Sequence, residues 1–512
     1  MSKPVLAATA AAAFIWASLA GATYAGKSND TLTWATDRDV TVVDPYYNNT
    51  RELVIVGHMS WDGLLHRDVQ TGEYKPLLAT AYEWVDDTTM EFELRDDVVF
   101  HNGEALDADD VVYTINFVAD PDRGVLTQQL VSWMDHAEKI DERTVRLHLK
   151  EPFPAALAYL ANAVFIMPEG HYDDAPEAAD GRQDYGAVEP VGTGPYKVTE
   201  VVPGERIVMQ ANPDYLKDGP KGEPSIGTIV FRTIKEPNTQ IAELLTGGLD
   251  WIWDVPKDQA ERLAEYENVT VVNAPTMRVS YLQFDVSGKS GVDYFTNKTV
   301  REAVAHAIDR ESIASNLVGG ASVVIHSACH PEQFGCTQDV VQWEYDPDLA
   351  REKLVEAGYP DGFAFDLYAY RQREYTEAVI GYLAEIGLEP NLKFMQYNAL
   401  RELVWENQTP MNHMTWGSNS IPDASAITSH FFTGGRDDFA KDPQVIQSLQ
   451  EADTTIDPDK RAALYEDALS RIAGELYWLP MFTYAKNYAY TADLDFTPTS
   501  DEIPPFYAAS WK

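Results

Sequence analysis

The chain has 512 residues, of which 45% are hydrophobic and 11% aromatic, so it is long enough for two or three globular cores. Its 81 acidic and 39 basic residues give a formal net charge of −42, and such a surface repels nucleic acid. Nucleic-acid binding is therefore excluded. The acidic residues are scattered along the chain, which indicates a solubilising surface and is compatible with a saline habitat.

The first 25 residues have the pattern of a secretory signal peptide. Lys3 is their only charge, an apolar and small-residue run extends from Val5 to Ala22, and Thr23-Tyr24-Ala25 offers a small-x-small cleavage site. An uncleaved membrane anchor is the alternative, since about 18 apolar residues can just span a bilayer. The run is rich in alanine and no stop-transfer charges follow it, which favours cleavage and a periplasmic location.

Between residues 77 and 112 the pattern predicts a strand, a turn and a capped helix. Met90, Phe92 and Leu94 alternate with charged residues, as in a strand with one exposed face. Asp107 can cap a helix, with Asp110 three residues later. Upstream, residues 32–36 are expected to form a first strand, and the turn after Asp44-Pro45 carries Tyr46 and Tyr47.

The rest of the chain favours an α/β fold. Residues 239–245 are expected to form a helix that leads into a strand at 249–253, and residues 300–310 have the apolar spacing of an amphipathic helix. The Gly-rich segment at 191–196 is followed by Pro195 and a strand. A phosphate-binding loop would end in Lys-Ser or Lys-Thr and enter a helix, so nucleotide binding is rejected.

The two cysteines, Cys329 and Cys336, are separated by six residues that include Pro331 and Gly335. This spacing makes a closable loop, and in an oxidising compartment a local disulfide is expected. A metal site that uses both cysteines and His330 is the alternative, but it lacks a clear fourth ligand.

Several of these segments resemble, in the right order, the motifs of the solute-binding proteins of peptide-type ATP-driven importers. The matching motifs are Leu77-Leu78-Ala79 through Trp84, Phe92-x-Leu94-Arg95, Val98-x-Phe100-His101-x-Gly103, Gly192-Thr193-Gly194-Pro195-Tyr196, and the helix from Val300 to Arg310. The resemblance covers residues 30–490. It implies an α/β, two-lobed periplasmic binding protein fold (type II, cluster C) with an extra inserted domain.

The resemblance also implies a domain organisation. Lobe I is expected to be discontinuous, with the inserted domain following its first segment. The expected ranges are 1–25 for the signal peptide, 26–50, 191–280 and 481–512 for lobe I, 51–190 for the inserted domain, and 281–480 for the second, ligand-binding lobe.

Two segments are expected to carry the ligand, because dipeptide-binding members use them. In those members an aspartate holds the peptide's α-ammonium, and the matching position here is Ser418, so this ion pair is lost. Their carboxylate-gripping arginine matches Arg373, although Arg371 and Arg373 could equally be solvated loop charges. The full set of predicted ligand-binding residues is Tyr46, Tyr47, Arg373, Tyr375, Trp416, Ser418, Asn419 and Asp423.

The function expected from the resemblance is capture of a small peptide or peptide-like solute, with delivery to the membrane permease subunits of an ABC importer. We expect a monomer that is not an enzyme and needs no cofactor or metal, since the sequence has no Gly-x-Ser-x-Gly or His-Glu-x-x-His motif. Ser418 leaves open a non-peptide solute such as an oligosaccharide, an opine or an anionic conjugate. An exported hydrolase that uses acidic residues is a more distant alternative.

Overall fold

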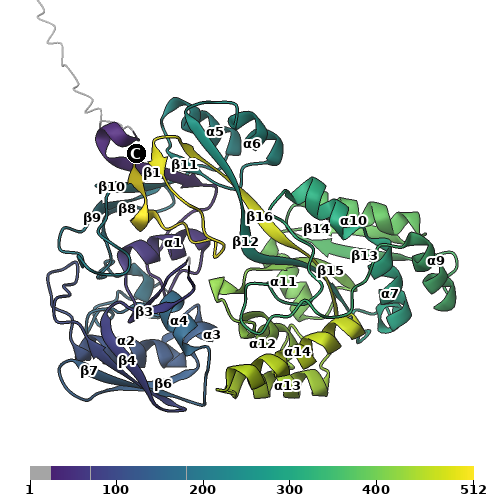
Figure 1. The fold of residues 1–512 in the computed structure, drawn as a ribbon, viewed down its shortest axis with the longest axis horizontal. Coiled ribbons are helices and arrows are strands. Elements are labelled where there is room, and N and C mark those ends of the chain that lie inside the picture. Colours follow the sequence, from purple (N-terminus) through teal and green to yellow (C-terminus); the bar gives the residue numbers. More distant parts are fainter. Residues whose placement is uncertain (1–24, 70, 180) are drawn as a thin grey trace, which may run out of the picture.

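The computed structural model describes residues 25–69, 71–179 and 181–512, and Figure 1 shows two lobes joined by a pair of long strands. The predicted signal peptide lies outside the described residues except for Ala25. In the described chain, ten strands form one sheet in the order β14-β13-β15-β12-β16-β11-β1-β10-β9-β8. None of the helices in this part of the chain is both long enough and apolar enough to cross a membrane.

The first lobe contains one half of the large sheet. Its core is aromatic: Trp34 and Trp251 are fully buried, and their rings meet edge to face at 6.2 Å. Trp511 Nε1 donates a hydrogen bond to Asp30, so the end of the chain lies beside its first strand. The elements are β1 (Thr31–Thr36), β8 (Tyr196–Val202), β9 (Arg206–Ala211), β10 (Thr228–Thr233), β11 (Trp251–Ile252), α5 (Pro237–Thr246), α6 (Lys257–Leu263), β17 (Leu494–Asp495) and β18 (Ser510–Trp511).

Two long strands connect the lobes, β12 (Val269–Phe284) and β16 (Trp478–Thr491). They pair antiparallel along most of their length, and Figure 1 shows them running from one lobe to the other. Their register shifts between Pro275 and Val279. Such an irregularity bends a strand and re-aims the side chains on it, and Arg278 lies within it.

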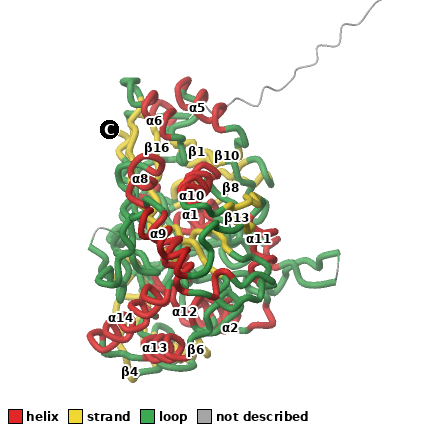
Figure 2. Tube along the Cα trace, turned by 90° about the vertical axis from the view of Figure 1, so that its right-hand side faces the viewer, coloured by secondary structure: helices red, strands yellow, loops and turns green. Residues whose placement is uncertain are grey.

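The second lobe alternates strands and helices around the other half of the sheet. Strand β13 is parallel to both β14 and β15, so their carboxyl ends meet at one edge. Figure 2, a view from the side of this lobe, shows its helices in front of its strands. The elements are β13 (Ala364–Ala369), β14 (Glu389–Phe394), β15 (Met411–Trp416), α7 (Lys298–Ala307), α8 (Arg310–Ile313), α9 (Pro347–Glu356), α10 (Arg373–Glu385), α11 (Tyr397–Trp405), α12 (Ser425–Phe432), α13 (Pro443–Thr454) and α14 (Pro458–Glu475).

A separate four-stranded antiparallel sheet, in the order β4-β5-β7-β6, lies in the part between β1 and β8. Met90, Phe92 and Leu94 are buried, as the alternation predicted, and Asp107 forms a reciprocal capping box with Asp110 at the start of α2. The elements are α1 (Arg51–Ser60), β2 (Leu65–Arg67), β3 (Tyr74–Pro76), β4 (Ala79–Asp86), β5 (Thr89–Leu94), α2 (Ala108–Ala119), α3 (Gln128–Val131), β6 (Met134–Lys139), β7 (Thr144–Leu149) and α4 (Ala156–Ala163).

The Gly-rich segment at 191–196 is a packing motif. A Cβ on Gly192 would lie 2.1 Å from the carbonyl oxygen of Ser60, and one on Gly194 would lie 2.5 Å from that of Met59. The backbone N–H of His101 donates to the Gly192 carbonyl at 2.8 Å. Glycine is therefore required because the segment lies against the end of α1, and two of the motifs found in the sequence contact each other. The domain boundaries given above stay a prediction.

Candidate ligand-binding cleft

A cavity of about 600 Å³ lies between the lobes, at the carboxyl ends of strands from both sides. The first lobe contributes the residues that follow β1, α1 contributes its first residue, and the second lobe contributes the loops after β13 and β15. Ligands of open α/β sheets bind in such crevices outside the carboxyl ends of strands. A neighbouring cavity of about 290 Å³ shares five of its lining residues with the first, so the two are parts of one cleft.

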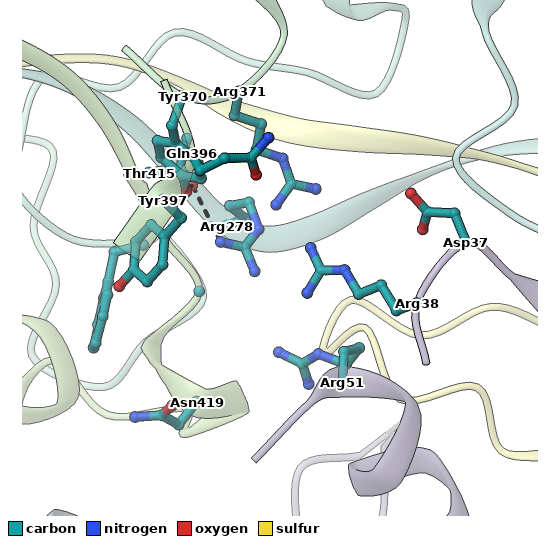
Figure 3. A pocket seen from close by; sticks show the side chains of 12 residues that line it. Asp37, Arg38, Arg51, Arg278, Tyr370, Arg371, Gln396, Tyr397, Thr415 and Asn419 are labelled. Carbon is teal, nitrogen blue, oxygen red and sulfur yellow. Dashed lines mark hydrogen bonds between the residues drawn. The ribbon is translucent and has the colours of Figure 1, made fainter. Parts of the chain in front are cut away.

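Four of the described arginines line this cavity, and Figure 3 shows their guanidinium groups pointing into the same space. Arg38 follows β1, and Arg51 is the first residue of α1. Arg278 lies at the irregularity of β12, and Arg371 lies in the loop between β13 and α10. Both lobes and a connecting strand therefore contribute positive charge to one site.

The carboxylate of Glu502 neutralises part of this positive charge. Its carboxylate lies 3.2 Å from Arg278 Nη2, 3.7 Å from Arg51 Nη2 and 3.2 Å from Lys486 Nζ. Burial alone would raise the pKa of Glu502, but Arg278, Lys486, Arg51 and Arg371 outweigh burial and hold that pKa well below its ordinary value. One buried carboxylate is thus paired with three cations and lies in the field of a fourth.

Arg38 and Arg371 are not in close ion pairs of this kind. Among the described residues neither guanidinium makes a direct hydrogen bond or a close ion pair, and that of Arg371 lies over the Tyr484 ring, 5.8 Å from its centroid. Burial lowers the pKa of Arg371, but the charges of Asp254 and Glu502 and the rings of Tyr370 and Tyr484 outweigh burial and raise that pKa above its ordinary value.

Asp37 is the one carboxylate among the described residues that line the larger cavity, and Glu52, Asp254 and Glu502 also line the smaller one. In a chain with a net charge of −42, the cleft is a local positive site, and guanidinium groups bind carboxylates and phosphates well.

The second lobe adds an aromatic wall. Tyr370 and Tyr397 lie with ring centroids 5.0 Å apart, and the Tyr370 hydroxyl is 2.7 Å from Thr415 Oγ1. Trp416 stacks on His430 at 4.6 Å and donates from Nε1 to the carbonyl of Ala426 at 2.9 Å. These contacts fix the rings before a ligand arrives, so they offer stacking area at low entropy cost.

A strained turn closes the cleft on the side of the second lobe. Ser418, Asn419 and Ser420 form a short 3₁₀ turn, η6, with φ of 50°, 49° and 64°. Left-handed backbone costs non-glycine residues of the order of 1 kcal/mol each, and such strain concentrates at functional sites. Arg51 Nη1 donates to Ser420 Oγ at 2.7 Å, a direct hydrogen bond from α1 to the second lobe.

The comparison that decides the family is a match of residues 73–439 to the family model described as "Bacterial extracellular solute-binding proteins, family 5 Middle". The chain belongs to this family. The family 5 resemblance inferred from the sequence and the two-lobed α/β fold are thereby confirmed, and the role of the chain is to bind a solute outside the cytoplasm.

Similar proteins agree with this assignment. The family 5 chain is 28% identical over 464 residues to the glutathione-binding protein GsiB of Salmonella typhi, covering 87% of this chain and 88% of the relative. The dipeptide binding protein of Pseudoalteromonas sp. SM9913, solved with Met-Leu, superposes with a TM-score of 0.80 at 23% identity over 94% of this chain and 100% of its own. NikA of Brucella suis, solved with Fe(III)-EDTA, has a TM-score of 0.82 at 23% identity with the same coverage.

The structure brings some of the predicted site residues of the family 5 protein to the cleft. Trp416 and Asn419 line the main cavity. Tyr375 lines an adjoining cavity of about 560 Å³ that Arg371 also lines. Ser418 belongs to the same turn as Asn419, but only 1% of its surface is exposed.

The other predicted site residues have different partners. Arg373 is exposed on α10 and its Nε lies 2.7 Å from Glu377. Tyr46 is fully buried and donates its hydroxyl to the carbonyl of Phe165 at 2.7 Å, and Tyr47 donates to that of Arg123 at 2.8 Å. Asp423 is buried in a bidentate ion pair with Arg461, at 2.7 and 2.8 Å. The structure does not place these four residues on the main cavity.

Sequence reasoning missed Arg38, Arg51 and Arg278, although each carries a local signal. Arg38 lies two residues beyond the end of a buried strand, the position where α/β folds bind ligands. Arg51 puts a cation at the N-terminus of a helix, which the helix dipole disfavours. Arg278 is a charged residue within a long, largely buried strand. Residues whose local preference conflicts with their place in the fold, as these do, are often functional.

The predicted disulfide between Cys329 and Cys336 is confirmed, and because it uses both sulfurs the alternative metal site is not formed. Its loop supports the cleft. The backbone N–H of Phe334 donates to the Pro422 carbonyl at 3.0 Å, and that of Ala424 donates to the Phe334 carbonyl at 2.9 Å. The disulfide loop therefore holds the segment that directly follows the strained turn.

Proposed function

We propose that this chain captures a small peptide or peptide-like solute with at least one carboxylate between its two lobes, and delivers it to the permease subunits of an ATP-driven importer. The observation that carries the proposal is the arginine-lined cavity shared by both lobes. Its volume of about 600 Å³ lies in the range of small-molecule sites. A guanidinium group holds a carboxylate through two parallel hydrogen bonds.

Similar proteins support a peptide-type cargo. The relatives named for glutathione binding align over most of this chain, and a structural neighbour was solved with the dipeptide Met-Leu. The rings of Tyr370, Tyr397 and Trp416 could pack against the body of a peptide, and the Asn419 amide could both donate to and accept from its peptide groups.

A non-peptide anion, such as an opine or an anionic conjugate, is the second candidate. Ser418 occupies the position where dipeptide-binding members hold the α-ammonium with an aspartate, and its side chain is buried. The main cavity thus gains no carboxylate from this turn, whereas it gains four guanidinium groups from elsewhere. A solute without a free amine would fit a cavity that has more guanidinium groups than carboxylates.

We further propose that the chain acts in the periplasm as a monomer after removal of residues 1–25, without a cofactor and without catalysis. The signal-like N-terminal segment and the family support export. The ring contacts around the cleft fix its side chains before a solute arrives, and this supports a binding role.

The test is identification of the solute. The full-length chain is produced with its own N-terminal segment in its native host, purified without denaturation and analysed by native mass spectrometry. We expect one bound solute that contains a carboxylate, with fragmentation at amide bonds if it is a peptide. Deletion of the gene should abolish uptake of that labelled solute. Protein with no bound solute, together with unchanged uptake of carboxylate-containing peptides, would contradict the proposal.

A further inference from the structure

We infer that removal of the signal segment after Ala25 completes the fold: the α-ammonium released on Gly26 forms an ion pair with the buried carboxylate of Asp250, and this pair anchors both ends of the mature chain. The inference rests on the export and processing proposed for this chain. It goes beyond them by giving the new N-terminus a structural partner, so that processing also stabilises the protein.

The first observation is that Asp250 is a buried carboxylate without a cation. Only 3% of its surface is exposed, and one carboxylate oxygen accepts the backbone N–H of Thr33 at 2.8 Å. In the part of the chain that the structure describes, no cation pairs with it. Burial raises the pKa of Asp250 to about 7, and only the backbone N–H groups of Thr33 and Gly26 act against burial. A carboxylate that stays charged in such a place needs an opposite charge beside it.

The second observation is that Gly26 lies next to this carboxylate. A Cβ built on Gly26 would lie 3.7 Å from Asp250 Oδ1. The Gly26 N–H donates to the Thr31 carbonyl at 2.8 Å, and the Gly26 carbonyl accepts from the Asn29 N–H at 3.1 Å. These backbone bonds hold residue 26 against the start of β1. The Gly26 nitrogen therefore stays beside Asp250 when the residue before it is removed.

Hydrolysis of the bond between Ala25 and Gly26 changes the donors at this nitrogen. When a leader peptidase adds water across the bond, the oxygen joins the Ala25 carbonyl carbon to give a carboxylate, and both protons pass to the nitrogen. The resulting ammonium has three N–H donors in place of one. One donor can keep the bond to Thr31, and a second can turn to Asp250. An α-amino group has an ordinary pKa of about 7.7–8.0, so it is charged at neutral pH.

The same corner of the first lobe also holds the C-terminus, which Figure 1 shows beside β1. Lys27 Nζ donates to the backbone oxygen of Lys512, and Trp511 Nε1 donates to Asp30 Oδ1 at 3.2 Å. Residues 27–30 thus hold the end of the chain, and Gly26 is the point from which they start. An ion pair at Gly26 would therefore steady both termini.

The experiment compares two N-termini on the otherwise identical chain, each released from a cleavable fusion. One chain begins at Gly26, and the other keeps Tyr24 and Ala25, which moves the ammonium away by two residues. In urea unfolding, the chain that begins at Gly26 should have an unfolding constant about tenfold or more lower, the equivalent of one hydrogen bond between charged groups. Its α-amine should also react about tenfold more slowly than that of the longer chain with a limiting amine reagent at pH 7, because an ion-paired ammonium keeps its proton.

Asp250→Asn and Asp44→Asn are the matched variants. Asp44 is also a buried carboxylate with a raised pKa, but it is held by the backbone N–H of Tyr46 and by the hydroxyl of Tyr172. In Asp250→Asn the two N-termini should have equal stability and equal amine reactivity. In Asp44→Asn both differences should persist, although this variant is less stable than the wild-type chain.

Equal stability and equal amine reactivity of the two wild-type chains would overturn the inference, and so would differences that persist in Asp250→Asn. The wild-type comparison decides the question even where Asp250→Asn fails to fold. The proposed function fails separately. Exported protein that begins at a residue other than Gly26 would refute the ion pair and keep the transport role, whereas an intact ion pair in a chain that captures no solute would do the reverse.

Discussion

Arg371 and Arg373 are two residues apart in the chain, but only Arg371 lines the cleft. The backbone of Gln372 between them has a φ of 36°, which turns the chain at the start of α10. Arg371 lies over Tyr484 at the junction of three adjoining cavities, whereas Arg373 pairs with Glu377 on the exposed face of the helix. The carboxylate grip that the sequence suggested for Arg373 therefore fits the geometry of Arg371.

Substitution of each arginine by alanine separates the two positions. Arg371→Ala should weaken binding of the co-purified solute by about 1.5–3 kcal/mol, the worth of a hydrogen bond to a charged group. Arg373→Ala should change it by less than about 0.5 kcal/mol, because its ion pair with Glu377 is exposed and lies on the helix surface. Calorimetry with the purified solute measures both. A large loss in Arg373→Ala with none in Arg371→Ala would restore the alignment made from the sequence.

Gly417 permits the close approach of Arg278 to the cleft turn. A Cβ at this position would lie 2.9 Å from Arg278 Nη2 and 3.4 Å from Glu502 Oε2. Gly417→Ala should displace the guanidinium and weaken solute binding about tenfold, with a smaller effect on stability. Gly381→Ala is the control: it has open space on α10, so it should leave binding unchanged and stabilise the chain by about 0.5–1 kcal/mol. If Gly417→Ala and Gly381→Ala bound the solute equally well, the close approach of Arg278 to Gly417 would not contribute to binding.

The disulfide should contribute to both stability and binding. In the chain-entropy treatment, a loop as short as the one between Cys329 and Cys336 is worth about 2–3 kcal/mol. The double variant Cys329→Ser with Cys336→Ser should lose that amount in urea unfolding. It should also bind solute more weakly, because Phe334 bonds to Pro422 and Ala424 beside the cleft turn. Thiol titration of denatured, unreduced wild-type protein should find no free thiol, and two free thiols would contradict the pairing.

Elements with a regular pattern could be predicted from the sequence, and contacts between distant segments could not. The alternation around Phe92 and the Asp107 cap are local, so they gave β5 and α2 correctly. The cleft depends on which loop ends meet, and a register shift of β12 against β16 aims Arg278 there. Tyrosine side chains often line binding sites, but Tyr46 lies in the core, where its hydroxyl donates a hydrogen bond to the Phe165 carbonyl. A tyrosine hydroxyl can bind a ligand or form a hydrogen bond in the core, and only the fold shows which of these it does.

Glu502 should have opposite effects on stability and on anion binding. Its buried carboxylate faces Arg51, Arg278 and Lys486, so Glu502→Gln leaves these cations without their counter-charge and should cost about 3–5 kcal/mol of unfolding free energy at neutral pH. The same change makes the cleft more positive. The variant should therefore bind citrate more tightly than the wild-type chain, in spite of its lower stability.

The pH dependence follows from the pKa of Glu502, which its cationic neighbours hold well below the ordinary 4.5. A carboxyl group with a lowered pKa contributes its full stabilisation above its unfolded-state pKa, and this is lost as the pH falls through the folded-state value. The wild-type unfolding midpoint should therefore fall below pH 4.5 more steeply than that of Glu502→Gln.

Asp62→Asn is the control for Glu502→Gln. Asp62 lies in a fully buried pair with Lys221 at 2.6 Å, away from the cleft, so its loss should destabilise the chain without changing citrate affinity. Urea unfolding across pH and citrate titration of the three proteins measure all of these effects. If Glu502→Gln bound citrate no more tightly than Asp62→Asn, the positive charge of the cleft would not be what attracts anions.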